Sequence, residues 1–347
     1  MMTLQKFDAS PFLDAAAVEA WDSWFRLREH GRLRDISVEA TWERVARALA
    51  AASPQPGRWI SRVIDAQARW NIVLDARIVA AAGTATFAWP DDPVAVINAA
   101  TFVTSPFSRS AQFDFGAFRT AADLAVECLD NALQLNTRDD AVHSDLQVGL
   151  IGVADTLAML NKRYDSASGR VLASRLAQAL AEACFGADVR LARTRGAMSN
   201  ERTDTAILRA RKRGMPPELI AAAECSGLRH SRLTAIHPQR RLAEFANHAT
   251  DAIDPLPGGN PPARTYAAIV AGRTAVAAET CADMLPLARR QSISAQLALR
   301  GAMQPWIDAP IDYPLKVDEL PDNRAAAHWR TLAAAHHLGN LVLQKRA

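Results

Sequence analysis

The residues best suited to chemistry lie in one short segment, RLTAIHPQRRLAEF, at residues 232–245. The apolar run at 233–236 is typical of a buried strand, and a proline-containing turn follows it. At that turn, the neighbouring guanidinium groups of Arg240 and Arg241 can hold a phosphate through charge-assisted hydrogen bonds. The predicted phosphate or nucleotide site consists of Arg240, Arg241, Gln239 and Thr234. The alternative is that both arginines lie on a solvated helix start and pair with Glu244.

Three histidines near this segment raise the question of a metal site. His230, His237 and His248 are separated by seven and eleven residues, so they do not share one helical face. No acidic residue completes a known ligand pattern, and we expect no metal site and either surface or hydrogen-bonded core histidines.

The basic run RARKRG at 209–214 lacks interleaved aromatic residues, and the net charge is only +3. We therefore expect a solvated helix end there and no nucleic-acid partner.

The cysteines give no redox or zinc pattern. The four of them, Cys128, Cys184, Cys225 and Cys281, are widely separated and form no CxxC pair. Two fall inside amphipathic helical patterns, where a cysteine is usually a small buried hydrophobe, and Cys225 ends a helical pattern. We expect no catalytic residue among them and a reducing, cytoplasmic location. The chain start has no basic region followed by an apolar core, and no run approaches the ~20 apolar residues of a membrane span, so no membrane partner is expected.

Composition and periodicity indicate a mainly helical protein. The chain has 347 residues, of which 49% are hydrophobic, and alanine-rich stretches outnumber β-branched alternating runs. Helix starts are predicted after Ser37, Asp114, Ser144, Ser166 and Pro216. The helix after Ser144 covers LQVGLIGVADTLAML, whose two glycines require another backbone to approach closely. Further helices are expected near 287–304 and 323–338, and short strands at AAGT (81–84), VAVINA (94–99) and RLTAI (232–236).

Several stretches, in this order, resemble the large subunit of ribonucleotide reductase, especially its cobalamin-dependent branch. TWERVARALA (41–50) resembles the family's N-terminal helical entry, and RIVAAAGT (77–84) resembles its asparagine-alanine-glycine-threonine strand. INAATFV (97–103) is similar to SINLARFV, and VGLIGVADTLAMLNKRYDS (148–166) is similar to GVMGLADLLAMLGIPYDS. RHSRLTAIHPQRR resembles RNALLTAIAPTGT, and PWIDAPIDYPLKVDE (305–319) resembles the family's late strand. The resemblance implies a buried hydrogen bond or salt bridge for Asp155.

The departures from the family are as informative as the matches. The family carries a thiyl radical on a loop inside a ten-stranded α/β barrel, with two more cysteines as reductants. Here only a dozen residues separate AAGT from INAA, where the family has much of that barrel. The alignment puts Asp92 at the second redox cysteine, and a carboxylate forms no disulfide. The turn PTGT, which offers backbone N–H groups to the substrate phosphate, is replaced by PQRR.

The predicted fold is therefore mainly α with a few short strands, a remnant of the reductase α/β barrel scaffold and not a closed ten-stranded barrel. We expect an N-terminal helical segment at 1–57, a reductase-like core at 58–254 and a C-terminal helical segment packed on it at 255–347. The break DPLPGGNPPAR at 254–264 marks the last boundary.

The predicted function is that of a large-subunit-like protein that has lost the radical and redox cysteines and binds a nucleotide, a phosphate or a partner protein without catalysis. One alternative is a reductase-class enzyme active only with another chain, which requires a thiol near Arg240, with Cys225 the sequence-local candidate. Another is a helical assembly protein without ligand. No cofactor follows from the residues, and adenosylcobalamin follows from the resemblance alone. We expect a homo-oligomer, most simply a dimer, because a half-scaffold leaves uncovered the apolar face of Leu146, Leu150, Val153 and Leu157.

Overall fold

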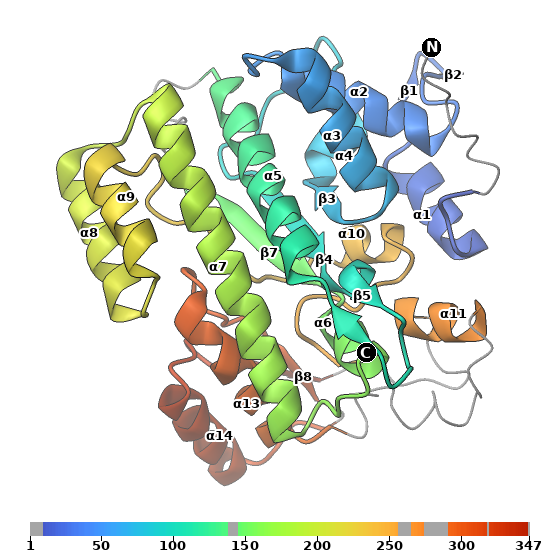
Figure 1. The fold of residues 1–347 in the computed structure, drawn as a ribbon. Coiled ribbons are helices and arrows are strands. Elements are labelled where there is room, and N and C mark those ends of the chain that lie inside the picture. Colours follow the sequence, from blue (N-terminus) through green and yellow to red (C-terminus); the bar gives the residue numbers. More distant parts are fainter. Residues whose placement is uncertain (1–9, 138–144, 256–264, 274–290, 318, 346–347) are drawn as a thin grey trace.

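The structure, a computed structural model, describes residues 10–137, 145–255, 265–273, 291–317 and 319–345. Helices dominate these residues and the strands are few and short, as predicted (Figure 1). The largest sheet in the described part of the chain has three strands, and no closed barrel is formed there. No helix among the described residues is both long and apolar enough to cross a membrane.

The N-terminal region is a group of helices and one small hairpin. Its elements are α1 (Ala15–Trp24), β1 (Arg28–Glu29), β2 (Arg32–Leu33), α2 (Val38–Ala50), α3 (Pro56–Ala68) and α4 (Ala76–Ala81). The Ser37 hydroxyl accepts the N–H of Ala40 at 3.3 Å and begins α2, which confirms the predicted cap. The strand predicted at 81–84 is wrong, because those residues end α4 and turn at Gly83, where φ is +88°.

The central sheet has the order β3 (Ile72–Leu74), β4 (Val94–Asn98), β7 (Gln147–Ile151). β4 pairs antiparallel with β3 and parallel with β7, and the crossover to β7 passes through α5 (Phe115–Gln134). β4 confirms the strand predicted at 94–99. The segment predicted at 232–236 forms a single parallel bridge between Val148 and Thr234, so it extends the same sheet on the far side of β7.

The long helix predicted after Ser144 is wrong. Residues 147–151 form β7, and only Val153–Met159 form a helix, α6; Ser144 itself lies outside the described residues. A short apolar run that is buried on both faces has no clear period, so spacing alone does not separate strand from helix. The predicted close backbone approach does occur, because a Cβ at Gly149 would lie 2.6 Å from the carbonyl oxygen of Ala235.

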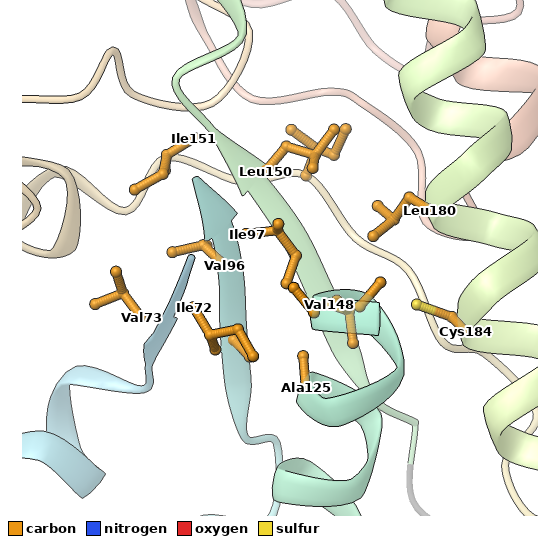
Figure 2. Packing of buried hydrophobic residues seen from close by; sticks show 14 of the residues in the cluster. Ile72, Val73, Val96, Ile97, Ala125, Val148, Leu150, Ile151, Leu180 and Cys184 are labelled. Carbon is orange, nitrogen blue, oxygen red and sulfur yellow. The ribbon is translucent and has the colours of Figure 1, made fainter. Parts of the chain in front are cut away.

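Helix α7 (Ala167–Arg195) runs along the sheet and packs on α5, α9 (Pro217–Ser226) and α13 (Ile293–Met303) (Figure 1). The predicted cap holds, since the Ser166 hydroxyl accepts the N–H of Gly169 at 3.0 Å. Figure 2 shows Leu180 and Cys184 of α7 pointing toward Leu150 and Val148 of β7. This contact buries one face of the sheet within the monomer.

The remaining elements complete the covering of the core. They are η1 (Ala99–Phe102), β5 (Val103–Thr104), β6 (Gln112–Phe113), α8 (Asn200–Lys212), α9 (Pro217–Ser226), α10 (Arg240–Phe245), α11 (Tyr266–Arg273), α13 (Ile293–Met303), η4 (Gln304–Trp306), β8 (Leu315–Val317), α14 (Asn323–Ala335) and β9 (Leu343–Lys345). One apolar cluster includes residues from Phe12 to Leu338. The division at 57 and 254 stays a prediction.

The reason given for a dimer is wrong. All four residues of the apolar face expected to need a partner are at most 1% exposed within the monomer: Leu146, Leu150, Val153 and Leu157. They lie on β7, on α6 and directly before β7, and their own chain covers them. The oligomeric state itself stays a prediction.

Candidate functional site

The carboxyl ends of β4, β7 and residues 233–236 lie at one edge of the sheet, the edge at which α/β folds usually bind ligands. Asn98 ends β4 and is fully buried, and its side-chain oxygen accepts the N–H of Ala100 at 3.3 Å. Gly152 follows β7 with φ +72°, and a Cβ there would lie 2.4 Å from Oδ1 of Asn98. Only glycine fits at this contact, so the two strand ends are closely packed.

Asp155 fastens a later part of the chain over these strand ends. It lies in the first turn of α6, and its carboxylate accepts the N–H of Thr250 at 2.6 Å and that of Ala267 at 2.9 Å. The carbonyl of Thr250 in turn accepts the N–H of Gly152 at 2.7 Å. Burial raises the pKa of Asp155 more than these N–H groups lower it. The buried hydrogen bond expected of Asp155 is therefore present.

An apolar cluster fills the space beneath α11. It is formed by Ala100, Ala158, Met159 and Ala267, and Tyr266 and Val270 of α11 pack against it. The chain's own residues therefore cover this edge of the sheet.

The structure divides the predicted phosphate site into two sets of contacts. In the first, Thr234 is buried, and its N–H and its hydroxyl each donate to Oδ2 of Asp308 at 3.1 Å. The same carboxylate accepts the N–H of Leu233 at 2.9 Å and pairs with Arg213 at 2.8 Å. Thr234 thus connects the sheet edge to the loop before β8. Arg213 comes from the basic run predicted to be a solvated helix end, so that part of the run turns inward.

The second set lies at the start of α10. The N–H of Gln239 donates to Oδ1 of Asp251 at 2.6 Å, and Arg240 pairs with Glu244 at 2.7 Å while its side chain is 80% exposed. The guanidinium carbon of Arg241 lies 5.6 Å from the ring centre of Trp24, within cation–π range. Gln239, Arg240 and Arg241 therefore meet at one helix start, and the Glu244 pairing of the alternative interpretation is present for Arg240.

A buried ionic cluster that the sequence did not indicate joins α5, α7 and the segment after α9. Nε of Arg229 lies 2.5 Å from Oδ1 of Asp130, and Nδ1 of His230 lies 2.6 Å from Oδ1 of Asp188. Arg195 pairs with the other oxygen of Asp130. Burial raises the pKa of Asp130, but hydrogen bonds and charges from His230 and Arg229 outweigh it and lower the pKa to about 2.

This cluster identifies His230 as a hydrogen-bonded core residue. Burial lowers its pKa, but the contacts with Asp130 and Asp188 raise the pKa by more. Among the described residues, no group of histidine, cysteine, aspartate and glutamate is arranged to hold a metal ion. The sequence contains no local signal of this cluster, because its pairs form between segments that are distant along the chain.

The three described cysteines lie on three different helices. Cys128 and Cys184 are buried in α5 and α7, and burial raises the pKa of both thiols. Cys225 is exposed near the end of α9, which lies on the opposite side of α7 from α10 and Arg240 (Figure 1). Cys281 lies outside the described residues.

The position that the alignment assigns to a redox cysteine has an electrostatic role instead. Asp92 lies just before β4 with its side chain 64% exposed, and it pairs with Arg77 at 2.9 Å. Arg77 also pairs with Asp75, which caps α4 by accepting the N–H of Arg77 at 2.9 Å. Asp92 therefore links the segment before β4 to α4 through an ion pair with Arg77.

Comparison with known proteins agrees with this architecture. Residues 93–258 match the family model described as the ribonucleotide reductase barrel domain. The matched segment begins at β4, includes the sheet edge, the buried ionic cluster and the start of α10, and covers just under half of the chain. No curated protein matches this sequence.

Proposed function

We propose that this chain, which is ribonucleotide reductase large-subunit-like over residues 93–258, is a non-catalytic binding protein. The observation that best supports the proposal is the covering of the sheet edge. Asp155 holds residue 250 and the start of α11 over the ends of β4 and β7. A substrate at the usual place would have to displace two charge-assisted hydrogen bonds and an apolar cluster.

The thiols support the same conclusion. Reduction of a ribonucleotide by this family requires one cysteine for the radical and two for the reducing electrons. Here a carboxylate, Asp92, takes one of these positions, and the thiols of Cys128 and Cys184 are buried and held protonated. A protonated thiol buried among apolar side chains is a poor nucleophile for thiol–disulfide exchange.

The ligand we propose is a phosphate-bearing molecule held by Arg240 and Arg241, with Gln239 and Thr234 in the supporting backbone. The N–H groups of Gln239 and Thr234 already donate to Asp251 and Asp308, so the guanidinium groups would supply the contacts. Each guanidinium has five N–H donors, and the pair with Glu244 uses only part of those on Arg240. Binding would be weak and salt-dependent, because both arginines are exposed.

The test is calorimetric titration with ADP of the parent, of the variant Arg240→Ala/Arg241→Ala and of the control Arg324→Ala/Arg330→Ala on α14. The control removes the same two charges from another exposed surface. The proposal expects the parent and the control to bind ADP alike and the Arg240/Arg241 variant to lose binding. Equal binding by all three proteins, or no binding by the parent, would remove the phosphate site from the proposal.

The enzymatic alternative now has less support. It requires a thiol near Arg240, and the sequence-local candidate, Cys225, lies across the molecule on α9. Apart from any contribution of Cys281, a partner chain would therefore have to supply the thiols near Arg240. Binding of a partner protein remains part of the proposal, and the ADP titration does not test it.

A further inference from the structure

A second cationic site lies away from the sheet edge, in a cavity of about 290 Å³ between α3, α5 and α7. Arg58 and Arg62 line it from α3, and Arg190 and Arg195 line it from α7. Glu127 of α5 is the carboxylate in its wall. We propose that this cavity binds a compact phosphate-bearing anion, independently of Arg240 and Arg241.

The four guanidinium groups have donors to spare. Arg62 pairs with Glu127 at 3.2 Å, Arg190 pairs with Asp123, and Arg195 pairs with Asp130. For Arg58 the described residues include no ion-pair partner. Because a guanidinium carries five N–H donors, these pairs leave several donors able to reach an anion in the cavity. The cavity lining contains four arginines and one carboxylate, Glu127, so the lining is net positive.

Part of the site is held rigidly by the buried ionic cluster. The side chain of Arg195 is only 16% exposed, and Asp130, its partner, is fully buried and also pairs with Arg229. Nη2 of Arg195 also lies 3.5 Å from the carbonyl oxygen of Ala52, on the loop before α3. A guanidinium fixed in this way loses little conformational entropy on binding, which favours affinity.

The carboxylate in the cavity wall, Glu127, already has hydrogen-bond partners. Oε2 of Glu127 accepts the indole N–H of Trp59 at 3.0 Å as well as the Arg62 contact. Burial raises the pKa of Glu127 and that of Asp123 more than the nearby arginines lower them. Burial therefore disfavours the charged form of both acids beside these guanidinium groups.

The start of α3 adds to the positive potential. Gln55 precedes the helix without a side-chain cap, and no acidic residue lies in the first turn. The first N–H groups of a 13-residue helix carry a partial positive charge, and here they lie beside Arg58. The cavity volume is near the lower limit, about 300 Å³, for small-molecule sites, which points to a compact ligand.

The test uses inorganic pyrophosphate as the probe and calorimetry at fixed ionic strength. Arg58→Ala is the informative variant, because that side chain is exposed and its loss removes no ion pair seen in the described residues. Arg69→Ala is the matched control, since Arg69 ends the same helix, is 73% exposed and does not line the cavity. We expect Arg58→Ala to weaken binding about tenfold, which corresponds to about 1.4 kcal/mol, and Arg69→Ala to leave it unchanged.

A second variant, Arg58→Glu, should abolish binding by placing a carboxylate in the cavity. The variant Arg240→Ala/Arg241→Ala should bind pyrophosphate as the parent does, which separates this site from the proposed ADP site. Failure of the parent to bind pyrophosphate would overturn the inference. So would equal binding by the parent and Arg58→Glu, or loss of binding in the Arg240/Arg241 variant alone.

Discussion

The carboxylate of Asp155 accepts the backbone N–H of Thr250 at 2.6 Å, although 95 residues separate them in the sequence. The contact joins the first turn of α6 to a segment that crosses the carboxyl ends of the central strands. A second N–H, from Ala267, donates to the same carboxylate at 2.9 Å. The closed sheet edge therefore depends largely on one buried acid.

Replacement of Asp155 by alanine should destabilise the protein by about 3 kcal/mol, because two buried N–H groups lose their acceptor. Asp155→Asn should recover part of that loss, since the amide oxygen accepts only some of these bonds. Urea unfolding at neutral pH measures both changes. Asp165→Asn is the control, an exposed acid paired with Arg163 at 3.0 Å, and it should change stability by less than about 1 kcal/mol. Equal effects at the two positions would contradict this role for Asp155.

Gly152→Ala should also be destabilising, by about 2 to 4 kcal/mol, for two separable reasons. The residue has φ +72°, and the added Cβ would lie 2.4 Å from Oδ1 of Asn98. Gly214→Ala isolates the first reason, because Gly214 has φ +80° with nothing within 4 Å of the added atom. It should cost about 1 to 2 kcal/mol. If the two substitutions lower the free energy of unfolding equally, the added Cβ at position 152 does not clash with Asn98.

The double variant Asn98→Ala/Gly152→Ala separates the clash from the backbone strain. Removal of the Asn98 side chain should recover part of the cost of Gly152→Ala, so the two changes should not be additive. Thermal unfolding of the four proteins of this cycle gives the coupling free energy. If the free-energy changes of the two single variants are strictly additive, a clash with Asn98 does not account for the cost of Gly152→Ala.

Local signals predicted much of the fold, and contacts between distant segments account for what they missed. The caps at Ser37 and Ser166 depend on a hydroxyl and an N–H three residues away, so spacing was sufficient. β7 differs from the helix predicted there because its residues are buried on both faces, which removes the period of two expected of a strand. β7 pairs with β4 and bridges Thr234, and both partners lie far from β7 in the sequence.

The candidate site shows the same limit. Two adjacent arginines are visible in the sequence, and so is the Glu244 four residues after Arg240 that pairs with it. The carboxylate that accepts hydrogen bonds from Thr234 belongs to Asp308, 74 residues later in the sequence. Asp130 pairs with Arg229, and 99 residues separate them. No local pattern predicts such pairs, because the fold and not the spacing brings them together.

Asp130 should make stability depend on pH on the acid side. Its folded pKa of about 2 lies below the ordinary 3.8, so its contribution is complete above pH 3.8 and is lost as the pH falls toward 2. The difference in free energy of unfolding between the parent and Asp130→Asn should therefore shrink by about 2 kcal/mol over that range. Denaturant unfolding from pH 6 to pH 2 measures it. A difference that stays constant over that range would show that the carboxylate is not held by His230 and Arg229.

The cysteines should differ sharply in reactivity. Cys225 is exposed and should react with a thiol reagent in the native protein, whereas Cys128 and Cys184 should react only after unfolding. Peptide mass spectrometry after timed labelling assigns each site and follows Cys281 separately. Rapid native labelling of Cys128 or Cys184 would reopen a redox role for that thiol.

A reduction assay tests most directly the proposal that the chain does not reduce ribonucleotides. The purified protein would be incubated with ribonucleoside di- and triphosphates, adenosylcobalamin and a dithiol reductant, beside an active cobalamin-dependent reductase as positive control. We expect no deoxyribonucleotide above the background of the variant Cys128→Ala/Cys184→Ala/Cys225→Ala/Cys281→Ala, while the control enzyme turns over. Deoxyribonucleotide formed by the parent and lost in the four-cysteine variant would contradict the non-catalytic account.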